Sequence, residues 1–470
     1  MQMTSIGRFS HESETFGNPS VPTVFLVLTG PKPFTSSDFI QLWRERGVSE
    51  KHPRFEQRID ETKPGYFSAA TKDLDHRVSD TTFPSMYRKD LASRMSHFLT
   101  APLAVYEALW EARVATGAIG TSGAISKLKS DNVPDHHTSE SLILFRSHHA
   151  LADGASLVSA FLDLCDEAEE LQQAIQAGVK RRVKRAKGLL DKLLKWWQRV
   201  LWLCYGSIQS CLYQFKLHWD MPFNPFERVL ELSGVDPTDA HSRRTVSWCD
   251  AAPLDQVQRV ARAHGPATTI NDVWVSCVSY AVAKQLEQHR KRLELHGKVL
   301  PVFDHINIVV PVHLSGGVLL PNQSIGNFIG AFGARIPGET SGDRLSEVHQ
   351  TLSWVKRSPA PLLGYVSARL TSALPLFLTK YLFRKASANA CVTISNVRGS
   401  PKMLHIDGNT VQGMAGFVPL PPGIPVGVAI MSYAGTLSLT VTAEPWAVPD
   451  ADQFLLWMLD EYKRLLRETY

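Results

Sequence analysis

The chain has few cysteines, and no two of them stand in a C-x-x-C spacing. The six cysteines lie singly along the 470 residues, a pattern that argues against structural zinc sites and thioredoxin-type motifs. Isolated thiols of this kind are typical of reduced, mostly buried cysteines in a protein that faces the cytosol. We therefore expect no bound metal. The residues concerned are Cys165, Cys204, Cys211, Cys249, Cys277 and Cys391.

An apolar leader is also missing, because residues 1–20 are polar and lack the h-region of a signal peptide. The chain holds no short internal repeat and no low-complexity tract. What remains is an ordinary globular composition, with 44% hydrophobic and 20% charged residues. The length suits two domains of roughly 200 residues each. From the polar start of the chain we expect a protein that is not secreted.

Acidic residues are scarce in one segment. Between Lys180 and Arg199 there are nine basic residues, and Asp191 is the one acid. The whole chain carries a net charge of only +5, so its basic character is confined to this segment. Because the basic run leads directly into a Trp-rich apolar stretch, we expect no nucleic-acid partner.

Strand and helix patterns alternate along both halves of the chain. Residues 22–30 are typical of a strand, and the consecutive apolar residues 142–145 predict a strand that is buried on both faces. Residues 268–286 are apolar nearly all round and predict a buried helix. This alternation predicts α/β layers in two lobes. The predicted parts are an N-terminal lobe at 1–175, a basic, Trp-rich linker at 176–241 and a C-terminal lobe at 242–470.

The most informative motif is HHALADG, residues 148–154. A buried strand delivers two adjacent histidines to its C-terminal end, and Asp153 and Gly154 follow at the predicted start of a helix. Histidine suits proton transfer because its ordinary pKa is about 6.5. One imidazole at the strand end, facing a cleft, can take a proton from a hydroxyl that attacks an acyl carbonyl.

Paired histidines have two other common roles. Adjacent strand residues point to opposite faces, so two neighbouring histidines are often plain surface residues or hydrogen-bonded core residues. His136 and His137, in a polar loop, are an example of a pair to which we assign no role. Zinc ligands usually stand two or more positions apart, so that their side chains converge. Adjacent histidines converge badly, and the buried strand before them and the Asp-Gly after them favour catalysis.

The HHALADG segment resembles the HHxxxDG motif of the coenzyme-A-dependent acyltransferase superfamily. From about Thr23 onward the chain resembles, more specifically, the wax ester synthase/diacylglycerol acyltransferase (WS/DGAT) family of bacteria and plants. Further segments carry this resemblance in the family's order and approximate spacing. They are residues 108–111 (ALWE), 271–273 (NDV), 311–328, 395–400 (SNVRGS) and 432–437.

The resemblance implies a fold and a reaction. The fold is a two-lobed α/β architecture like that of chloramphenicol acetyltransferase, with mixed sheets and a channel between the lobes. The reaction moves a long acyl group from acyl-CoA to a fatty alcohol, to diacylglycerol or to both. Acyl-CoA is then a substrate, and no separate cofactor is implied.

Roles for individual residues also follow from the resemblance. It implies His149 as the general base, with His148 and Asp153 as structural support. The oxyanion of the tetrahedral intermediate needs preorganised donors, and Asn271 in the first turn of a helix is a candidate. Helix capping explains the pair Asn271-Asp272 equally well. The pair Ser395-Asn396 could line the channel, but it is also explained as the polar end of a strand. The candidate support residues are Gly154, Asn271, Asp272, Ser395 and Asn396.

Three other functions fit parts of the sequence. An amide-forming condensation enzyme uses the same histidine motif, but it is expected beside a carrier domain, for which 470 residues leave no room. A BAHD-type plant acyltransferase would carry an Asp-Phe-Gly-Trp-Gly loop, which is missing here. A non-catalytic protein of membrane surfaces or lipid droplets remains as the third, although the intact histidine motif argues against it.

The segment after the basic run predicts an amphipathic helix. Apolar residues recur every three or four positions from Leu189 to Phe215, with aromatic residues of the type that settles at headgroup level among them. The longest uncharged run, 200–215, is shorter than the ~20 residues that span a bilayer. We therefore expect this helix to lie on the cytosolic face of the endoplasmic reticulum or on a lipid droplet. Packing on the protein's own core and a tilted span are the alternatives.

Overall fold

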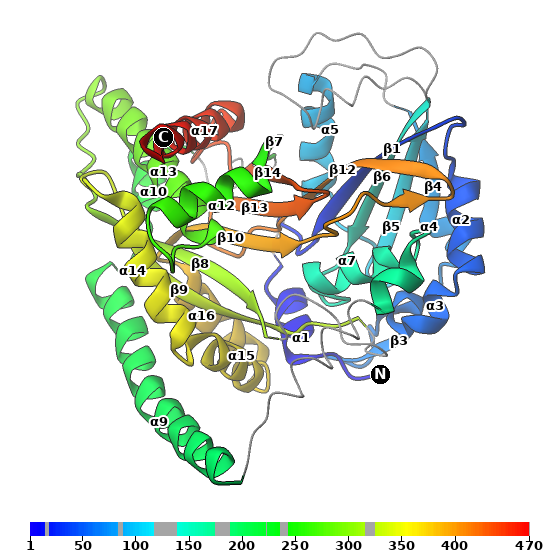
Figure 1. Ribbon diagram of the computed structural model, residues 1–470, viewed down its shortest axis with the longest axis horizontal. Coiled ribbons are helices and arrows are strands. Elements are labelled where there is room, and N and C mark those ends of the chain that lie inside the picture. The colour runs from blue at the N-terminus through cyan, green and yellow to red at the C-terminus, as the bar shows by residue number, and fades with distance from the viewer. Residues whose placement is uncertain are drawn as a thin grey trace.

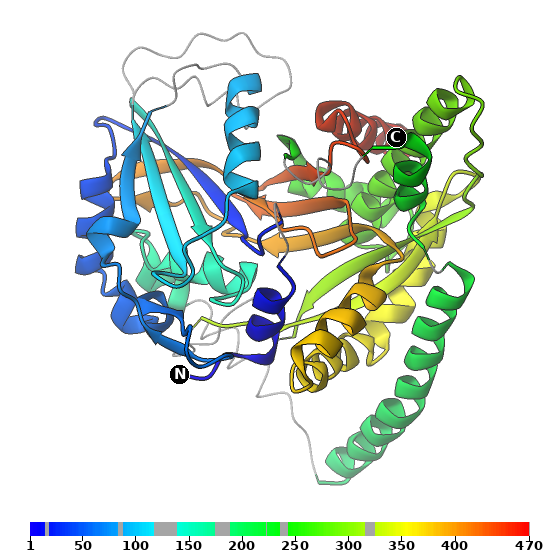
Figure 2. The same cartoon turned by 180° about the vertical axis from the view of Figure 1, so that it is seen from behind.

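Two six-stranded sheets, side by side, organise the molecule (Figures 1 and 2). Each sheet combines parallel with antiparallel strand pairs and carries helices, so the predicted two-lobed α/β class with mixed sheets is confirmed. The computed structural model describes residues 1–14, 18–82, 88–116, 139–173, 189–221, 223–235, 243–314 and 325–469.

The first sheet is built around two buried strands, β1 (Thr23–Gly30) and β6 (Ser139–Ser147), which pair antiparallel. Neighbouring residues of β1 enter different apolar clusters, Phe25 on one face and Leu26 on the other. The central strands are therefore buried on both faces, as the consecutive apolar residues of β6 predict. The outer strands are β11 (His405–Ile406) and β12 (Asn409–Phe417) on one side, and β5 (Trp110–Thr116) and β4 (Val78–Thr81) on the other.

Helices cover both faces of this sheet. α5 (Arg88–Thr100) packs on one face, and α2 (Ser36–Glu45) and α7 (Gly154–Leu162) pack on the other. α2 begins with a capping box, in which the side chains of Thr35 and Asp38 satisfy free backbone N–H groups. The smaller elements are α1 (Ser5–Glu12), α3 (Val48–Lys51), η1 (Pro53–Glu56), α4 (Leu74–Arg77), β2 (Gln57–Ile59) and β3 (Phe67–Ala69).

The second sheet has the larger core. Its helix α13 (Ile270–Glu294) is buried along most of its first half, which confirms the buried helix that the all-round apolar sequence predicts. α17 (Ala451–Thr469) lies beside α13 (Figure 1). The strands, in spatial order, are β7 (Thr245–Pro253), β14 (Thr436–Ala443), β13 (Val426–Tyr433), β10 (Ala390–Arg398), β8 (His305–His313) and β9 (Ile329–Pro337). The remaining helices of this core are α10 (Pro225–Ser233), α12 (Leu254–Ala263) and α14 (Arg344–Arg357).

The predicted division of the chain differs from the lobes in two places. β12 belongs by sequence to the C-terminal part, yet it pairs with β1 and completes the first sheet. α10 falls in the predicted linker, yet its Phe226 is part of the core of the second lobe. Strand pairing and burial join residues far apart in sequence, and a linear boundary at 242 does not capture this.

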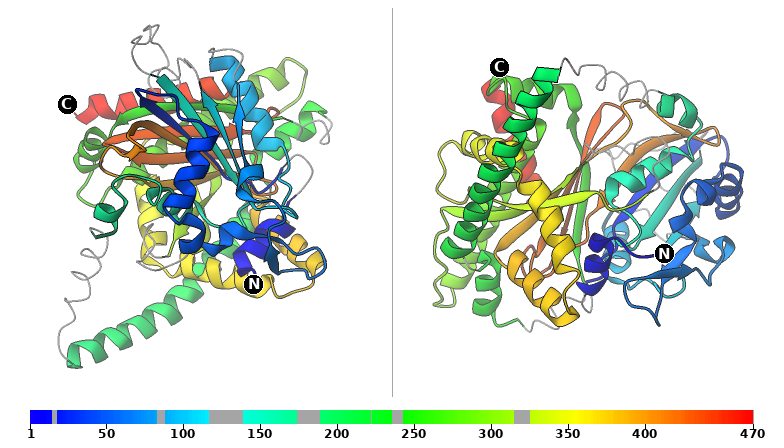
Figure 3. Two further views of the ribbon diagram at one scale, coloured as in Figure 1. Left: turned by 90° about the vertical axis from the view of Figure 1, so that its right-hand side faces the viewer. Right: turned by 90° about the horizontal axis from the view of Figure 1, so that it is seen from below.

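α9 (Leu189–Asp220) lies along the outside of the second lobe, next to α15 (Ala360–Thr371), and α16 (Leu376–Ser387) follows (Figures 1 and 3). Gly206 permits close packing of α9 on α15, because a Cβ there would lie 2.6 Å from Pro359. The predicted helix from Leu189 is thus confirmed, whereas residues 180–188 of the basic run lie outside the described residues. Within the described ranges, no helix is both long and apolar enough to cross a bilayer.

Candidate active site

The histidine motif lies where a strand ends and a helix begins. β6 ends at Ser147, and a tight turn then carries His148 and His149 to Asp153, the N-cap of α7. The Asp153 side chain accepts a hydrogen bond from the Ser156 N–H at 2.9 Å, the usual way to satisfy a free helix N-terminus. The strand end and the helix start are both where the sequence predicts them.

His149 is held by an amide from the second lobe. Its Nδ1 lies 3.1 Å from Oδ1 of Asn327, while Nδ2 of Asn327 donates to the carbonyl oxygens of His149 and Ala150 at 2.9 and 3.4 Å. Because the amide nitrogen must face those carbonyls, Oδ1 faces the imidazole and can only accept. Nδ1 is therefore the protonated nitrogen, and Nε2 keeps its lone pair for use as a base.

The surroundings of His149 favour its neutral form. Burial lowers the pKa of the imidazole, an effect larger than the opposing attraction of the Asp153 charge. A neutral imidazole is the form that accepts a proton, so this shift keeps the base available at neutral pH.

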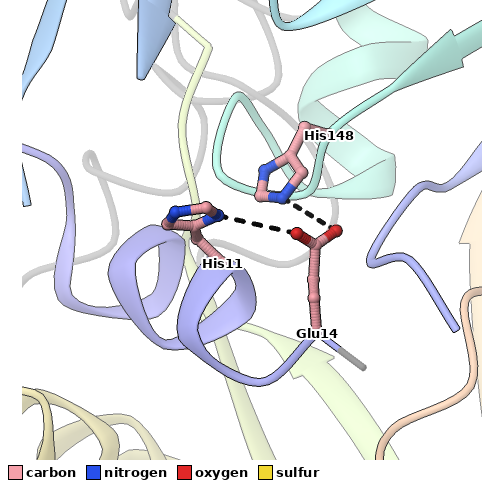
Figure 4. Close-up of side chains that lie close together, drawn as sticks. All are labelled: His11, Glu14 and His148. Atoms are coloured by element: carbon pink, nitrogen blue, oxygen red, sulfur yellow. Dashed lines mark ion pairs between the residues drawn. The ribbon is translucent and has the colours of Figure 1, made fainter. Parts of the chain in front are cut away.

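His148 is fully buried, with a hydrogen bond at Nδ1 and a carboxylate close to Nε2. Its Nδ1 accepts from the Ala150 N–H at 3.0 Å, which leaves the proton on Nε2. Nε2 lies 3.1 Å from Oε1 of Glu14, and Oε2 of Glu14 lies 3.5 Å from Nδ1 of His11 (Figure 4). Although burial opposes ionisation, the hydrogen bonds from His11 and His148 hold the pKa of the Glu14 carboxyl below its usual range.

The His11, Glu14 and His148 cluster has the residue types of a metal site, since its ligand atoms lie within 4.8 Å of one another. A metal at Nε2 of His148 would require the proton on Nδ1, which would then face the Ala150 N–H donor. The cluster therefore suits hydrogen bonding around an ionised Glu14 better than it suits a cation.

Asp153 ties the motif to the second lobe. Its Oδ2 accepts from the Phe328 N–H at 2.7 Å, and its own N–H donates to the Gly326 carbonyl at 3.0 Å. The Ser156 hydroxyl also donates to that carbonyl, at 2.8 Å. These bonds fix residues 326–328, which place Asn327 beside His149, and they support the structural role expected of Asp153.

A cavity of about 660 Å³ lies between the lobes beside His149. Asp153 and Gly154 line it from the first lobe, and Ser395 and Asn396 at the end of β10 line it from the second. Most of the other lining residues are apolar or small, and many of them come from α1, α9, α15 and α16. Those helices contribute Ile6, Phe9, Cys211, Leu363, Ala368, Leu382 and Phe383, and β9 contributes Phe332.

The predicted Asn-Asp pair separates into two roles. Asp272 is buried in the capping box of α13, where it accepts from the Thr269 N–H at 2.8 Å, and it also contacts His349 and Lys356 at 2.8 and 3.0 Å. Asn271 is hydrogen-bonded to the side chain of Asn396, which lines the cavity. Capping thus accounts for Asp272, while Asn271 borders the site through Asn396.

Two residues of the site are missing from the sequence-based candidates. Glu14 follows α1 in a polar stretch without a motif, so no sequence signal singles it out. Asn327 lies within residues 311–328, which carry part of the family resemblance, and that segment was the signal available. Both residues are more than a hundred positions away from the histidine that they contact, so no local pattern connects them with the motif.

Comparisons with known proteins agree with the resemblance. Residues 325–465 match the WS/DGAT C-terminal domain. A probable diacylglycerol O-acyltransferase of Mycobacterium tuberculosis is 26% identical over 220 residues, which are 46% of this chain and 45% of the relative. The match thus spans less than half the length of that relative. Wax ester synthase/diacylglycerol acyltransferase 2 of Arabidopsis thaliana is 22% identical over 404 residues, 80% of this chain and 75% of the relative.

A solved structure supports the fold over the full length. The wax ester synthase/diacylglycerol acyltransferase of Marinobacter aquaeolei VT8 superimposes with a TM-score of 0.59 at 16% identity, covering 100% of both chains. At this identity the likeness concerns the architecture, which is the two-lobed fold that the family resemblance implies.

Proposed function

Since the chain belongs to the WS/DGAT family, we propose that it transfers a long acyl group from acyl-CoA to the hydroxyl of a fatty alcohol or of diacylglycerol. The observation that carries this proposal is the state of His149, which lines the cavity between the lobes with Nδ1 bound to Asn327 and Nε2 free to accept a proton. A largely apolar cavity suits substrates with long chains.

The proposed reaction is a direct transfer. Nε2 of His149 takes the hydroxyl proton as the alcohol oxygen attacks the thioester carbonyl, and a tetrahedral intermediate forms. When the C–S bond breaks, the CoA sulfur leaves and receives that proton from the imidazolium, so the base is restored. Polar groups of Ser395, Asn396 and Asn271 are the proposed support for the oxyanion.

The proposed location follows from the substrates and from α9. Fatty alcohols and diacylglycerol reside in lipid phases, and α9 exposes a series of apolar side chains. We place the protein on the cytosolic face of the endoplasmic reticulum or on lipid droplets. Fractionation of cells is the direct test, and recovery of the protein entirely in the soluble fraction would contradict it.

Release of CoA and formation of ester, measured together with purified protein, test the reaction. Palmitoyl-CoA and hexadecanol should yield a wax ester. Palmitoyl-CoA and dioleoylglycerol should yield triacylglycerol. His149→Ala should lower turnover about 10²–10⁴-fold, the usual contribution of a general base, and His148→Ala should lower it less.

The remaining functions give different results in this assay. A condensation-type enzyme would acylate an amine such as hexadecylamine in preference to hexadecanol. A non-catalytic protein would release no CoA with any acceptor. A larger loss in His148→Ala than in His149→Ala would show that the roles of the two histidines are reversed.

A further inference from the structure

The outer face of α9 is apolar and open to solvent. Large apolar residues recur every third or fourth position along one side of the helix, and their exposed fractions are between 61% and 75%. This period places them on a single stripe. The residues are Leu201, Tyr205, Ile208, Leu212, Phe215 and Trp219.

The inner face of α9 carries more polar side chains than the outer face, although Leu217 and Tyr213 also pack inward. Ser210 is buried, and Nε2 of Gln214 donates to the Gly333 carbonyl at 2.9 Å. His218 accompanies them, and all three line the cavity. A helix on a protein surface in water has the opposite arrangement, with its apolar side inward. The reversal indicates that the outer face of α9 meets an apolar phase.

Two neighbouring helices repeat this pattern (Figures 1 and 3). On α15 the residues Leu362, Val366 and Leu370 are exposed at four-residue intervals, whereas Gly364 and Ala368 line the cavity. On α16 the exposed apolar residues are Phe377, Tyr381 and Leu382. Leu382 also lines the cavity, so the cavity reaches the outer face at α16.

The charge around these stripes is mostly positive. No aspartate or glutamate occurs from residue 348 to 406, a range that includes α15 and α16. Four basic side chains on these two helices are exposed: Arg369, Lys380, Arg384 and Lys385. On α9 the acids stand at the two ends, Asp191 and Asp220, and Asp220 is paired with Arg335 at 2.9 Å, whereas residues 192–219 contain none. A basic rim around apolar residues complements an anionic lipid surface.

We propose that the outer faces of α9, α15 and α16 form one docking surface for an anionic phospholipid bilayer, and that lipid substrates enter the cavity from that bilayer at α16. A second copy of this chain would fit less well, because a self-complementary contact would bring basic residues of one copy against basic residues of the other. The entry of substrates rests on the proposed function, whereas the docking does not.

Flotation of the full-length chain with vesicles tests the docking. The wild type should bind vesicles that contain phosphatidylserine more tightly than vesicles of phosphatidylcholine alone. The double variant Leu370→Ser with Phe377→Ser should weaken binding to both at least about tenfold, since each inserted large apolar side chain accounts for roughly that factor. Lys380→Glu with Arg384→Glu should weaken binding at least about tenfold only where phosphatidylserine is present.

Matched controls lie on the far side of the second lobe. Leu295 and Val299 are 85% and 79% exposed, and Leu295→Ser with Val299→Ser removes as much exposed apolar surface without touching the three helices. Arg262→Glu, on α12, controls for reversal of charge. Equal vesicle binding by the stripe variants and these controls would overturn the proposal. A second result would also overturn the proposal: sedimentation shows that the wild type is a dimer and the stripe variants are monomers, and the wild type binds no vesicles.

Activity on water-soluble substrates separates this inference from the proposed function. With butyryl-CoA and butanol the stripe variants should keep the wild-type rate, because neither substrate comes from a bilayer. With diacylglycerol in vesicles their rate should fall together with binding. Vesicle binding without any turnover would support the docking surface and would contradict the proposed acyltransferase activity.

Discussion

At the scale of single residues, the state of the candidate base depends on Asn327. Asn327→Leu removes the acceptor for Nδ1–H of His149, so the imidazole can adopt the wrong tautomer and kcat should fall by about one to two orders of magnitude. In the wild type, burial lowers the pKa of His149. The acidic limb of kcat/KM should therefore have its midpoint below about 6.5, the ordinary value of histidine.

A second variant tests the same assignment by charge. In Asn327→Asp a carboxylate faces the imidazole and raises its pKa, so the acidic limb should move to higher pH. The variant should also melt at a lower temperature, because its second oxygen faces the carbonyls of His149 and Ala150. An active Asn327→Asp protein with an unshifted limb would contradict the assignment of Nδ1 as the bound nitrogen.

Glu14 is expected to contribute to stability through His148. Glu14→Leu removes the carboxylate that lies 3.1 Å from the buried Nε2 of His148 and that accepts the Ser20 N–H at 2.8 Å, at a cost of about 1–3 kcal/mol in the free energy of unfolding. The carboxyl has a lowered pKa in the folded protein, so its ionised form stabilises the fold at neutral pH. This contribution is lost as the pH falls below about 4.3, the ordinary value of glutamate. Urea unfolding at neutral and acidic pH should show a smaller acid loss for Glu14→Gln than for the wild type.

At the scale of elements, the start of α13 separates capping from catalysis. Asp272→Ala removes one half of the capping box and the partner of His349 and Lys356. It should lower the free energy of unfolding by about 1–2 kcal/mol and leave kcat of the folded protein nearly unchanged. Asn271→Ala keeps the cap but removes the contact with Asn396, and it should lower kcat with little loss of stability. Thermal melting and steady-state kinetics of both variants distinguish the two roles.

At the scale of the whole molecule, the two lobes depend on each other. β12 pairs along β1, and Trp248 of β7 packs against Phe25 and Phe417 in a core that both lobes share. A fragment of residues 1–175 would lack β12, exposing the edge of a buried apolar strand, and it should aggregate when expressed alone. Coexpression with residues 189–470 should restore solubility, which a pull-down of the two fragments would show. A soluble, cooperatively folded 1–175 fragment would contradict this.

The sequence by itself determined the local elements and the position of the chemistry. Apolar runs predict β1 and β6, the all-round apolar segment predicts α13, and the Asp-Gly after the histidines predicts the start of α7, because these signals act over a few neighbouring residues. The HHxxxDG motif is equally local: its residue types and spacing single out the two histidines, and the family resemblance that the motif carries implies His149 as the candidate base.

The tertiary structure alone decided what completes the site. Glu14 meets His148 from outside its sheet, Asn327 meets His149 from the second lobe, and β12 returns to the first sheet from late in the chain. It also decided which side of α9 is buried, because the periodicity of a helix shows that it has two faces but not which of them the protein covers. These contacts join residues far apart in sequence, and their pairing depends on packing that no local pattern encodes.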